Sequence, residues 1–195
     1  TTQDNCPVLY ECMQFAKTHN KFISIGSLLL QTKNSKKLVN RSFFINNKGK
    51  IITYYDKIHL FDVKINRNEI HKESKTFKKG NNIVIANSPW GKLGLTICYD
   101  IRFPNLYRQL TKLGCIFLIV PAAFTIPTGK SHWQILLQSR AIENACFIIA
   151  AAQCGKHHGL RKTYGHSMVV DPWGKIIFKG LNRPGIFSTT LDLQL

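Results

Sequence analysis

Short apolar runs separated by Asn, Gly and Pro make up most of the chain. In the first run, Leu9, Met13 and Ala16 recur at helical spacing behind Pro7, so we expect a helix over residues 7–19. The runs that follow are each bounded by Asn, Gly or Pro, which is typical of strands. The predicted strands cover residues 21–31, 38–46, 50–55 and 82–88.

A further apolar run over residues 92–97 leads directly into Cys98 and is predicted to be a strand. The next helix is expected over residues 104–114, because Pro104 suits its first turn and Gly114 suits its end. A buried strand over residues 115–120 should follow it.

A second helix is predicted over residues 131–145, with Ser131 as its cap. Its apolar residues form one face, made of Trp133, Leu136, Leu137 and Ala141. After it we expect a strand, a polar loop and three more strands. These segments cover residues 146–153, 154–164, 165–172, 175–180 and 186–193.

The order of these elements indicates an α/β fold, because strand-helix-strand crossovers stand between two groups of β-hairpins. A chain of 195 residues, 44% of them hydrophobic, is long enough to bury a core, and we expect a single domain over residues 1–195. No apolar run approaches the roughly 18 residues that span a bilayer, so we expect no membrane association.

The first residues, TTQDNCP, lack the basic start and the apolar stretch of a signal peptide. The chain also begins with Thr rather than Met. We therefore expect either that residues have been removed or that the sequence starts inside a longer protein.

The formal net charge of +17 raises the hypothesis of a nucleic-acid-binding surface. The lysines are nevertheless scattered over several loops and have no recurring aromatic partners, whereas nucleic-acid sites concentrate charge on one element. The abundance of Lys, Asn and Ile is what an AT-rich genome would encode. We therefore expect no nucleic-acid partner.

The cysteines show no CxxC pair and no regular spacing, which argues against a zinc site and against a disulfide framework. They are Cys6, Cys12, Cys98, Cys115, Cys146 and Cys154. Thiols in a cytoplasmic protein are the simpler interpretation. We expect Cys115 and Cys146, which open apolar runs, to be small buried hydrophobic residues.

Cys98 lies where an apolar strand ends, shortly before a predicted helix. Enzymes of the α/β class place nucleophiles at such corners, although a cysteine there more often serves packing. A nucleophilic thiol needs a base or a nearby positive charge, because the thiolate is the reactive form. The chain offers several histidines for this task, and Lys57 as an alternative that would stabilise both thiolate and oxyanion.

Several segments, in order and spacing, resemble the nitrilase superfamily of carbon-nitrogen hydrolases. They are YDKIHLFDV (55–63), HKES (71–74), GLTICYDIRFP (94–104), HWQILLQSRAIEN (132–144), AAAQCGKHH (150–158) and YGHSMVVDPWG (164–174). The resemblance runs from about residue 7 to residue 193. HLFDV and QCGKHH further resemble the branch of amidases that act on deaminated glutathione.

The resemblance implies a four-layer α-β-β-α sandwich that lacks its first strands and helix. It also implies Cys98 as the nucleophile, Lys57 as the catalytic lysine and Glu73 as an auxiliary glutamate, with neither a metal nor an organic cofactor. Without the flanking motifs, Lys57 would be taken for a solvated lysine and Glu73 for a surface carboxylate balancing neighbouring lysines. A homodimer is the assembly common in the family.

The implied substrate is a small amide that carries carboxylates. The oxyanion would be held by Lys57 and the backbone N–H of Tyr99, and the family lines its pocket where this chain has Phe124, Thr128 and His132. Positive charge for the carboxylates could come from Lys130, His157, His158 and Arg161, for which a polar surface loop is the alternative interpretation. We discount a metal site at Cys154, His157, His158 and His166, because the spacing matches no zinc pattern.

One catalytic glutamate of the family lies upstream of the first predicted helix, and none of the four glutamates of this chain matches it. Glu11 falls in a different helix, and Glu143 is expected to pair with Arg140 or Arg102. The competing hypothesis is therefore a catalytically inactive remnant or an oligomerisation scaffold of the same fold.

Overall fold

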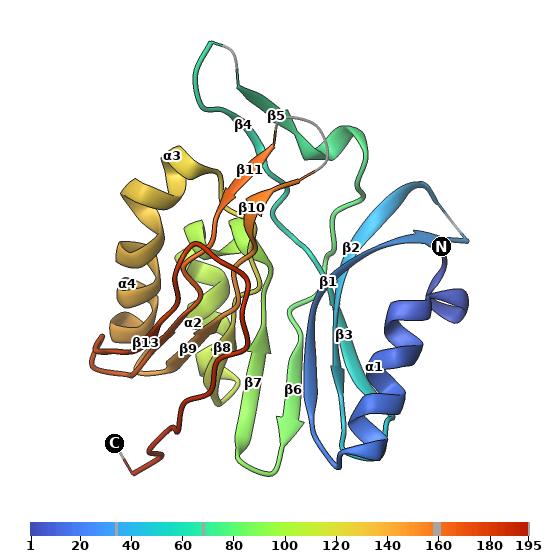
Figure 1. The fold of residues 1–195 in the computed structure, drawn as a ribbon, viewed down its shortest axis with the longest axis vertical. Helices are drawn as coiled ribbons and strands as arrows, with labels where there is room; N and C mark the ends of the chain where they lie inside the picture. The colour runs from blue at the N-terminus through green and yellow to red at the C-terminus, as the bar shows by residue number, and fades with distance from the viewer. Residues whose placement is uncertain (34, 68, 158–160, 195) are drawn as a thin grey trace. The chain divides into compact units, whose positions relative to one another are not determined.

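The computed structural model describes residues 1–33, 35–67, 69–157 and 161–194. The chain divides into two compact units, Thr1–Asn87 and Ser88–Leu195 (Figure 1). Helices and strands occur in both units, as the predicted α/β class requires. That residues 1–195 act as a single domain stays a prediction.

The first unit is built on an antiparallel sheet in the order β1-β2-β3. After a short 3-10 turn, η1 (Gln3–Asn5), the predicted first helix forms as α1 (Pro7–Thr18). It lies along this sheet (Figure 1). The strands are β1 (Ile23–Thr32), β2 (Ser35–Ile45) and β3 (Ile51–Asp56). Apolar residues of α1, β1 and β2 form the core of the unit, among them Leu9, Ala16, Ile25, Val39 and Phe43.

Beyond β3 the first unit contains a small hairpin that the sequence pattern did not predict. It consists of β4 (Asp62–Lys64) and β5 (Ile70–Lys72), which pair antiparallel, and it is followed by the 3-10 turn η2 (Glu73–Lys75). The boundary between the units falls in β6 (Ile85–Ser88).

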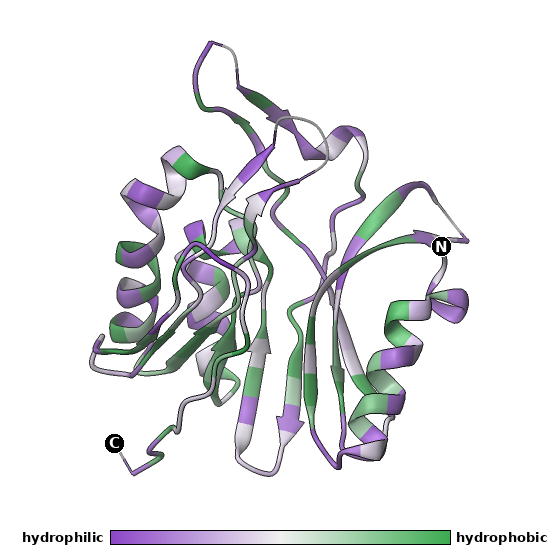
Figure 2. Ribbon diagram, viewed as in Figure 1, coloured by the Kyte–Doolittle hydropathy of each residue, from purple (hydrophilic) through white to green (hydrophobic). Residues whose placement is uncertain are grey.

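The sheet of the second unit contains the order β13-β12-β9-β8-β7. Strands β7 (Gly91–Leu95), β8 (Cys115–Ile119) and β9 (Phe147–Ala150) run parallel. Strands β12 (Met168–Val170) and β13 (Ile176–Lys179) extend the sheet antiparallel. The central strands β8 and β9 are mainly hydrophobic (Figure 2), as expected of parallel strands that are buried.

The crossovers between the parallel strands carry the 3-10 turn η3 (Cys98–Arg102) and two helices, α2 (Pro104–Lys112) and α4 (Gln134–Asn144). The two helices contact each other and pack on β8 and β9. Leu106 and Leu110 of α2 and Leu137 and Ala141 of α4 are buried, so their apolar faces point toward the sheet.

The prediction that Ser131 caps the second long helix is wrong. The helical segment begins earlier, at α3 (Ile126–Thr128), where the Thr125 side chain accepts from the Thr128 backbone N–H. It then passes through a π-helical turn, η4 (Gly129–Trp133), before α4. Exposed Ser131 lies inside that turn, so the π-helical insertion displaces the predicted start by five residues.

Two further predictions are corrected. The polar loop over residues 154–164 contains a hairpin of β10 (Cys154–Lys156) and β11 (Lys162–Tyr164). The strand predicted over residues 186–193 does not form, and Ile186 is fully exposed. Alternating apolar residues are insufficient there, because a strand also needs a neighbouring strand with which to pair.

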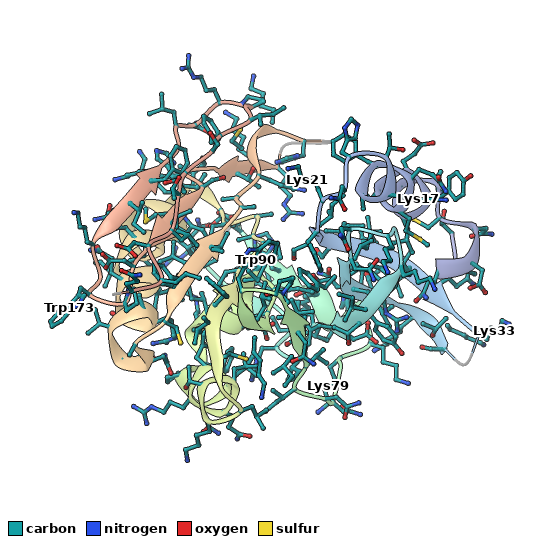
Figure 3. All side chains as sticks on the ribbon, turned by 90° about the horizontal axis from the view of Figure 1, so that it is seen from below. Lys17, Lys21, Lys33, Lys79, Trp90 and Trp173 are labelled. Atoms are coloured by element: carbon teal, nitrogen blue, oxygen red, sulfur yellow. The ribbon has the colours of Figure 1, made fainter. Side chains whose placement is uncertain are left out.

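Lysines project outward from separate elements of the molecule. In the first unit, exposed Lys17, Lys33 and Lys79 belong to α1, to the end of the β1 hairpin and to the segment before β6 (Figure 3). Among the described residues, none of the helices is both long and apolar enough to cross a membrane.

Candidate active site

Cys98 lies at the carboxyl end of two parallel strands of the second unit. Past the end of β7, the backbone continues to pair with the extension of β8: Thr96 N donates to Ile119 O over 3.1 Å, and Cys98 N donates to Pro121 O over 2.9 Å. The predicted strand-to-helix corner is therefore confirmed. Its position is the sheet edge where α/β proteins bind their ligands.

The turn at Cys98 is strained, and Asp100 holds it closed. Cys98 has a φ of 51°, a left-handed conformation that costs a residue with a side chain about 1–3 kcal/mol. Buried Asp100 accepts from the Ile97 N–H through Oδ2 at 2.8 Å, while its own N–H donates to Ile97 O at 3.1 Å. A strained cysteine between a strand and a helical turn has the local form of a nucleophile elbow.

The environment of other thiols makes them unsuitable as nucleophiles. Burial raises the pKa of Cys115 to about 11 and that of Cys146 to about 12, and it raises the pKa of Cys12 as well. Cys146 donates from Sγ to Cys115 O over 3.1 Å, so it acts as a buried donor. The prediction that Cys115 and Cys146 are buried is confirmed, and both stay protonated at neutral pH.

In the first unit, Lys57 follows directly on β3. Its backbone is fixed on both sides, because Lys57 N donates to Asn40 O over 2.9 Å and Lys57 O accepts from Gly80 N over 2.8 Å. The residue is 3% exposed, and its Nζ lies 2.6 Å from Glu73 Oε2. The alternative of a solvated lysine is therefore wrong.

Glu73 opens the turn η2 and is the counter-charge of Lys57. Its Oε2 also accepts from the Phe61 backbone N–H over 2.6 Å, and its Oε1 accepts from Asn40 Nδ2 over 3.3 Å. A buried ammonium is tolerated where a hydrogen-bonded carboxylate pairs with it. The structure thus brings together Lys57 and Glu73, and Glu73 is not the surface partner of its neighbouring lysines.

Three of the four residues predicted to bind substrate gather around Arg102 in the second unit. The Arg102 guanidinium carbon lies 5.9 Å from the centre of the Tyr99 ring and 5.6 Å from that of the Phe124 ring. Its Nη2 donates to His132 Nδ1 over 3.0 Å. Sequence reasoning missed Arg102 as a site residue, although it follows Tyr99 by three positions, a spacing that superimposes side chains in a 3-10 turn.

The fourth predicted residue, Thr128, belongs to a local turn. Its Oγ1 lies 2.8 Å from Thr125 Oγ1 and 3.4 Å from Thr125 O. Phe124, just before this turn, is buried with its ring 4.7 Å from that of Trp133. Thr128 is therefore held by Thr125, the cap of α3, in a turn next to the aromatic residues.

The residues proposed to bring positive charge have separate contacts. His157 Nε2 lies 2.6 Å from Thr163 Oγ1, Arg161 Nη2 donates to Ala123 O over 3.4 Å, and Lys130 is exposed. His158 lies outside the described residues. Within the described parts of the chain, no three His, Cys, Asp or Glu side chains are grouped as a metal site requires.

The remaining glutamates have other surroundings. Glu143 pairs with Arg140 over 2.7 Å, as one of the two predicted alternatives, and Glu69 Oε1 lies 3.1 Å from His71 Nε2. Glu11 is exposed on α1.

The chain matches the carbon-nitrogen hydrolase family over residues 2–195. It belongs to this family. Its relatives include three proteins named deaminated glutathione amidase. That of Yersinia enterocolitica is 45% identical over 96% of this chain, and that of Dictyostelium discoideum is 48% identical over 83%. The protein of Mus musculus is 40% identical over 97%.

The match covers 66%, 57% and 60% of these three carbon-nitrogen hydrolases, so the chain spans about three fifths of their length. Among solved structures, the C. elegans NitFhit protein superposes with a TM-score of 0.86 at 40% identity, over 92% of this chain and 44% of that one. Saccharomyces cerevisiae Nit3, a member of the nitrilase superfamily, gives a TM-score of 0.83 at 29% identity, over 93% and 64%. The α/β fold of the nitrilase superfamily is thereby confirmed.

Proposed function

We propose that this chain is part of an amidase that hydrolyses the C–N bond of a small carboxylated amide resembling deaminated glutathione, with Cys98 as nucleophile. The observation that carries the proposal is the strained, Asp100-closed turn that presents Cys98 at the carboxyl end of β7. Family membership and the names of the relatives support the reaction class and the substrate.

In the proposed first step, the Cys98 thiolate attacks the amide carbonyl and forms a C–S bond. The carbonyl π electrons move to oxygen, where Lys57 Nζ and the backbone N–H of Tyr99 stabilise the oxyanion. The C–N bond then breaks, and the nitrogen takes a proton from the family's catalytic glutamate, which acts as general acid, and leaves as ammonia. The product on the enzyme is a thioester.

In the second step, water attacks the thioester and loses a proton to the same glutamate, which now acts as general base. The carbon–sulfur bond breaks, the substrate leaves as a carboxylate, and the Cys98 thiolate is restored. Each step uses side chains and water.

Burial suits Lys57 to this task, because an ammonium in a region shielded from water interacts more strongly with a developing charge. Glu73 would orient that ammonium and the attacking water through its short contact with Lys57.

The substrate carboxylate has a candidate partner in Arg102. A guanidinium binds carboxylates through paired N–H donors, and aromatic rings hold its plane in place. Arg102 lies near the Tyr99 and Phe124 rings, four residues after the proposed nucleophile. This arrangement supports a carboxylated amide over an uncharged one.

We include in the proposal a cytoplasmic location and a homodimer. The location is supported by the six cysteines, which form no disulfide. The homodimer follows from the resemblance to the family, and sedimentation analysis of the purified protein would test it.

The proposal is tested by ammonia release from deaminated glutathione by the protein translated from the complete gene. We expect Cys98→Ala to abolish release, whereas Cys154→Ala, a thiol outside the proposed reaction, should retain it. Turnover by Cys98→Ala at the level of the parent protein would refute the assignment.

One observation favours a second candidate, an inactive remnant or scaffold. The described surroundings of the four glutamates leave none that matches the family's general acid and base. We therefore expect the 195 residues by themselves to release no ammonia. If the complete gene encodes that glutamate upstream, its product should be active, and if it does not, the scaffold is favoured.

A further inference from the structure

Asn40, in the middle of β2, contacts both members of the buried ion pair. Its backbone O accepts from Lys57 N over 2.9 Å, and its side-chain Nδ2 donates to Glu73 Oε1 over 3.3 Å. All of these groups belong to the first unit.

The other end of the Asn40 amide is left without a hydrogen bond. Oδ1 is buried and has no partner among the described residues. If the amide of Asn40 were flipped, its oxygen would face the carboxylate oxygen Oε1 of Glu73, and two acceptors would repel each other. The contact with Oε1 therefore fixes the orientation of the amide, with Nδ2 toward Glu73. A buried acceptor without a donor costs free energy that an apolar residue of similar size would not. Stability alone therefore does not explain an asparagine here.

The contact with Glu73 does explain it. Lys57 Nζ and Phe61 N both donate to Oε2 of Glu73, and neither bond restrains Oε1. The amide of Asn40 supplies a donor for that second oxygen. With donors on both oxygens, the plane of the carboxylate is fixed, and the direction of its contact with Lys57 is fixed with it.

We propose that Asn40 is a positioning residue, which holds Glu73 Oε1 and thereby aims the Lys57 ammonium. This inference rests on the proposed function of Lys57 and Glu73. Asn40 acts through these two residues, and no contact between its side chain and the substrate is required.

Asn40→Leu tests the proposal, because it removes both the donor and the unsatisfied acceptor at similar volume. In the protein from the complete gene, we expect kcat to fall about tenfold or more, while KM stays within about twofold. The melting temperature should fall only slightly, because removal of the unsatisfied Asn40 Oδ1 offsets the loss of the donor to Glu73 Oε1. Asn40→Asp keeps the shape but places a second carboxylate against Glu73, so kcat should fall at least as far.

A second measurement needs no activity. With ¹³C-labelled glutamate, the 195-residue chain gives carboxyl signals from four glutamates, and loss of one signal in Glu73→Gln assigns it. Asn40→Leu should shift the Glu73 signal. The matched control is Asn144→Leu, because Asn144 Nδ2 donates to Glu143 Oε1 over 3.4 Å, and this variant should shift Glu143 and leave Glu73 in place.

An unmoved Glu73 signal in Asn40→Leu would overturn the proposal. If the complete protein is active, an unchanged kcat in Asn40→Leu would also overturn the proposal. The same holds if kcat falls equally in Asn40→Leu and in the control Asn144→Leu. If no form of the protein hydrolyses an amide, the proposed function fails. The carboxyl signal then still decides whether Asn40 holds Glu73.

Discussion

Arg102 donates from Nη2 to Nδ1 of His132 across 3.0 Å, linking the turn that follows Cys98 to the π-helical turn before α4. Because a guanidinium has no acceptor, Nδ1 of His132 must accept, and the imidazole carries its proton on Nε2. His132 thereby restrains the guanidinium while leaving it further donors for a ligand.

The proposed carboxylate contact predicts a loss of specificity when Arg102 is replaced. In Arg102→Met, kcat/KM for a carboxylated amide should fall about 10- to 100-fold, the size of a charge-assisted hydrogen bond. For an uncharged amide of the same length it should change little. Arg108→Met, which removes an exposed arginine of α2, serves as the control. Equal losses on both amides would argue against the contact.

Breaking the buried ion pair should destabilise the protein strongly. Lys57→Met leaves the Glu73 carboxylate without its counter-charge, which costs about 3–5 kcal/mol for buried pairs. The double variant with Glu73→Gln should be less destabilised than the two single changes added together. Urea unfolding measures both effects, with exposed Lys79→Met as the control. Strict additivity would contradict a direct interaction.

The left-handed conformation of Cys98 reverses the usual order of stability between alanine and glycine. We expect Cys98→Gly to be more stable than Cys98→Ala by about 1 kcal/mol, because glycine adopts positive φ without strain. In α4 the order should be normal, so Ala141→Gly should destabilise the protein by at least about 1 kcal/mol. Thermal unfolding of these three variants would check the prediction, and a less stable Cys98→Gly would refute it.

Alkaline conditions should weaken the fold through Cys146. Its pKa is raised to about 12 by burial, above the ordinary 9.0 that it regains on unfolding. Between these values the native state retains a proton that the unfolded state has lost, so stability falls by up to about 1.4 kcal/mol per pH unit. Cys146→Ala should show a shallower decline between pH 9 and 11 in urea unfolding. Parallel declines would show that Cys146 does not contribute.

The sequence pattern was sufficient to locate Cys98, because a short strand that carries Leu93, Leu95 and Ile97 and is followed by a polar turn and Pro104 leaves little choice of geometry. It could not reveal the strain there, since that strain depends on Asp100 folding back onto Ile97. Lys57 and Glu73 were found through their flanking motifs. Their mutual contact follows from hydrogen bonds of Phe61 and Asn40, which no spacing rule encodes.

The wrong prediction of Ser131 as a cap and the overlooked Arg102 also have physical causes. Ser131 has the chemistry of a cap, but Thr125 has it too and lies where the chain leaves the sheet. Gly129 opens the π-helical turn, where the ring of Tyr164 occupies the place of a Cβ and excludes larger residues. Arg102 was overlooked because the grouping of its side chain with Tyr99 depends on a 3-10 rather than an α-helical turn.

The anchor of Glu73 at position 61 is a main-chain N–H, present in every amino acid except proline. A saturation library should therefore show unequal constraints on the two positions. Position 61 should accept many side chains of suitable bulk and reject proline, whereas position 73 should accept almost nothing but glutamate. Natural selection would then conserve this contact by conserving the glutamate at position 73. The side chain at position 61 would be free to change by genetic drift.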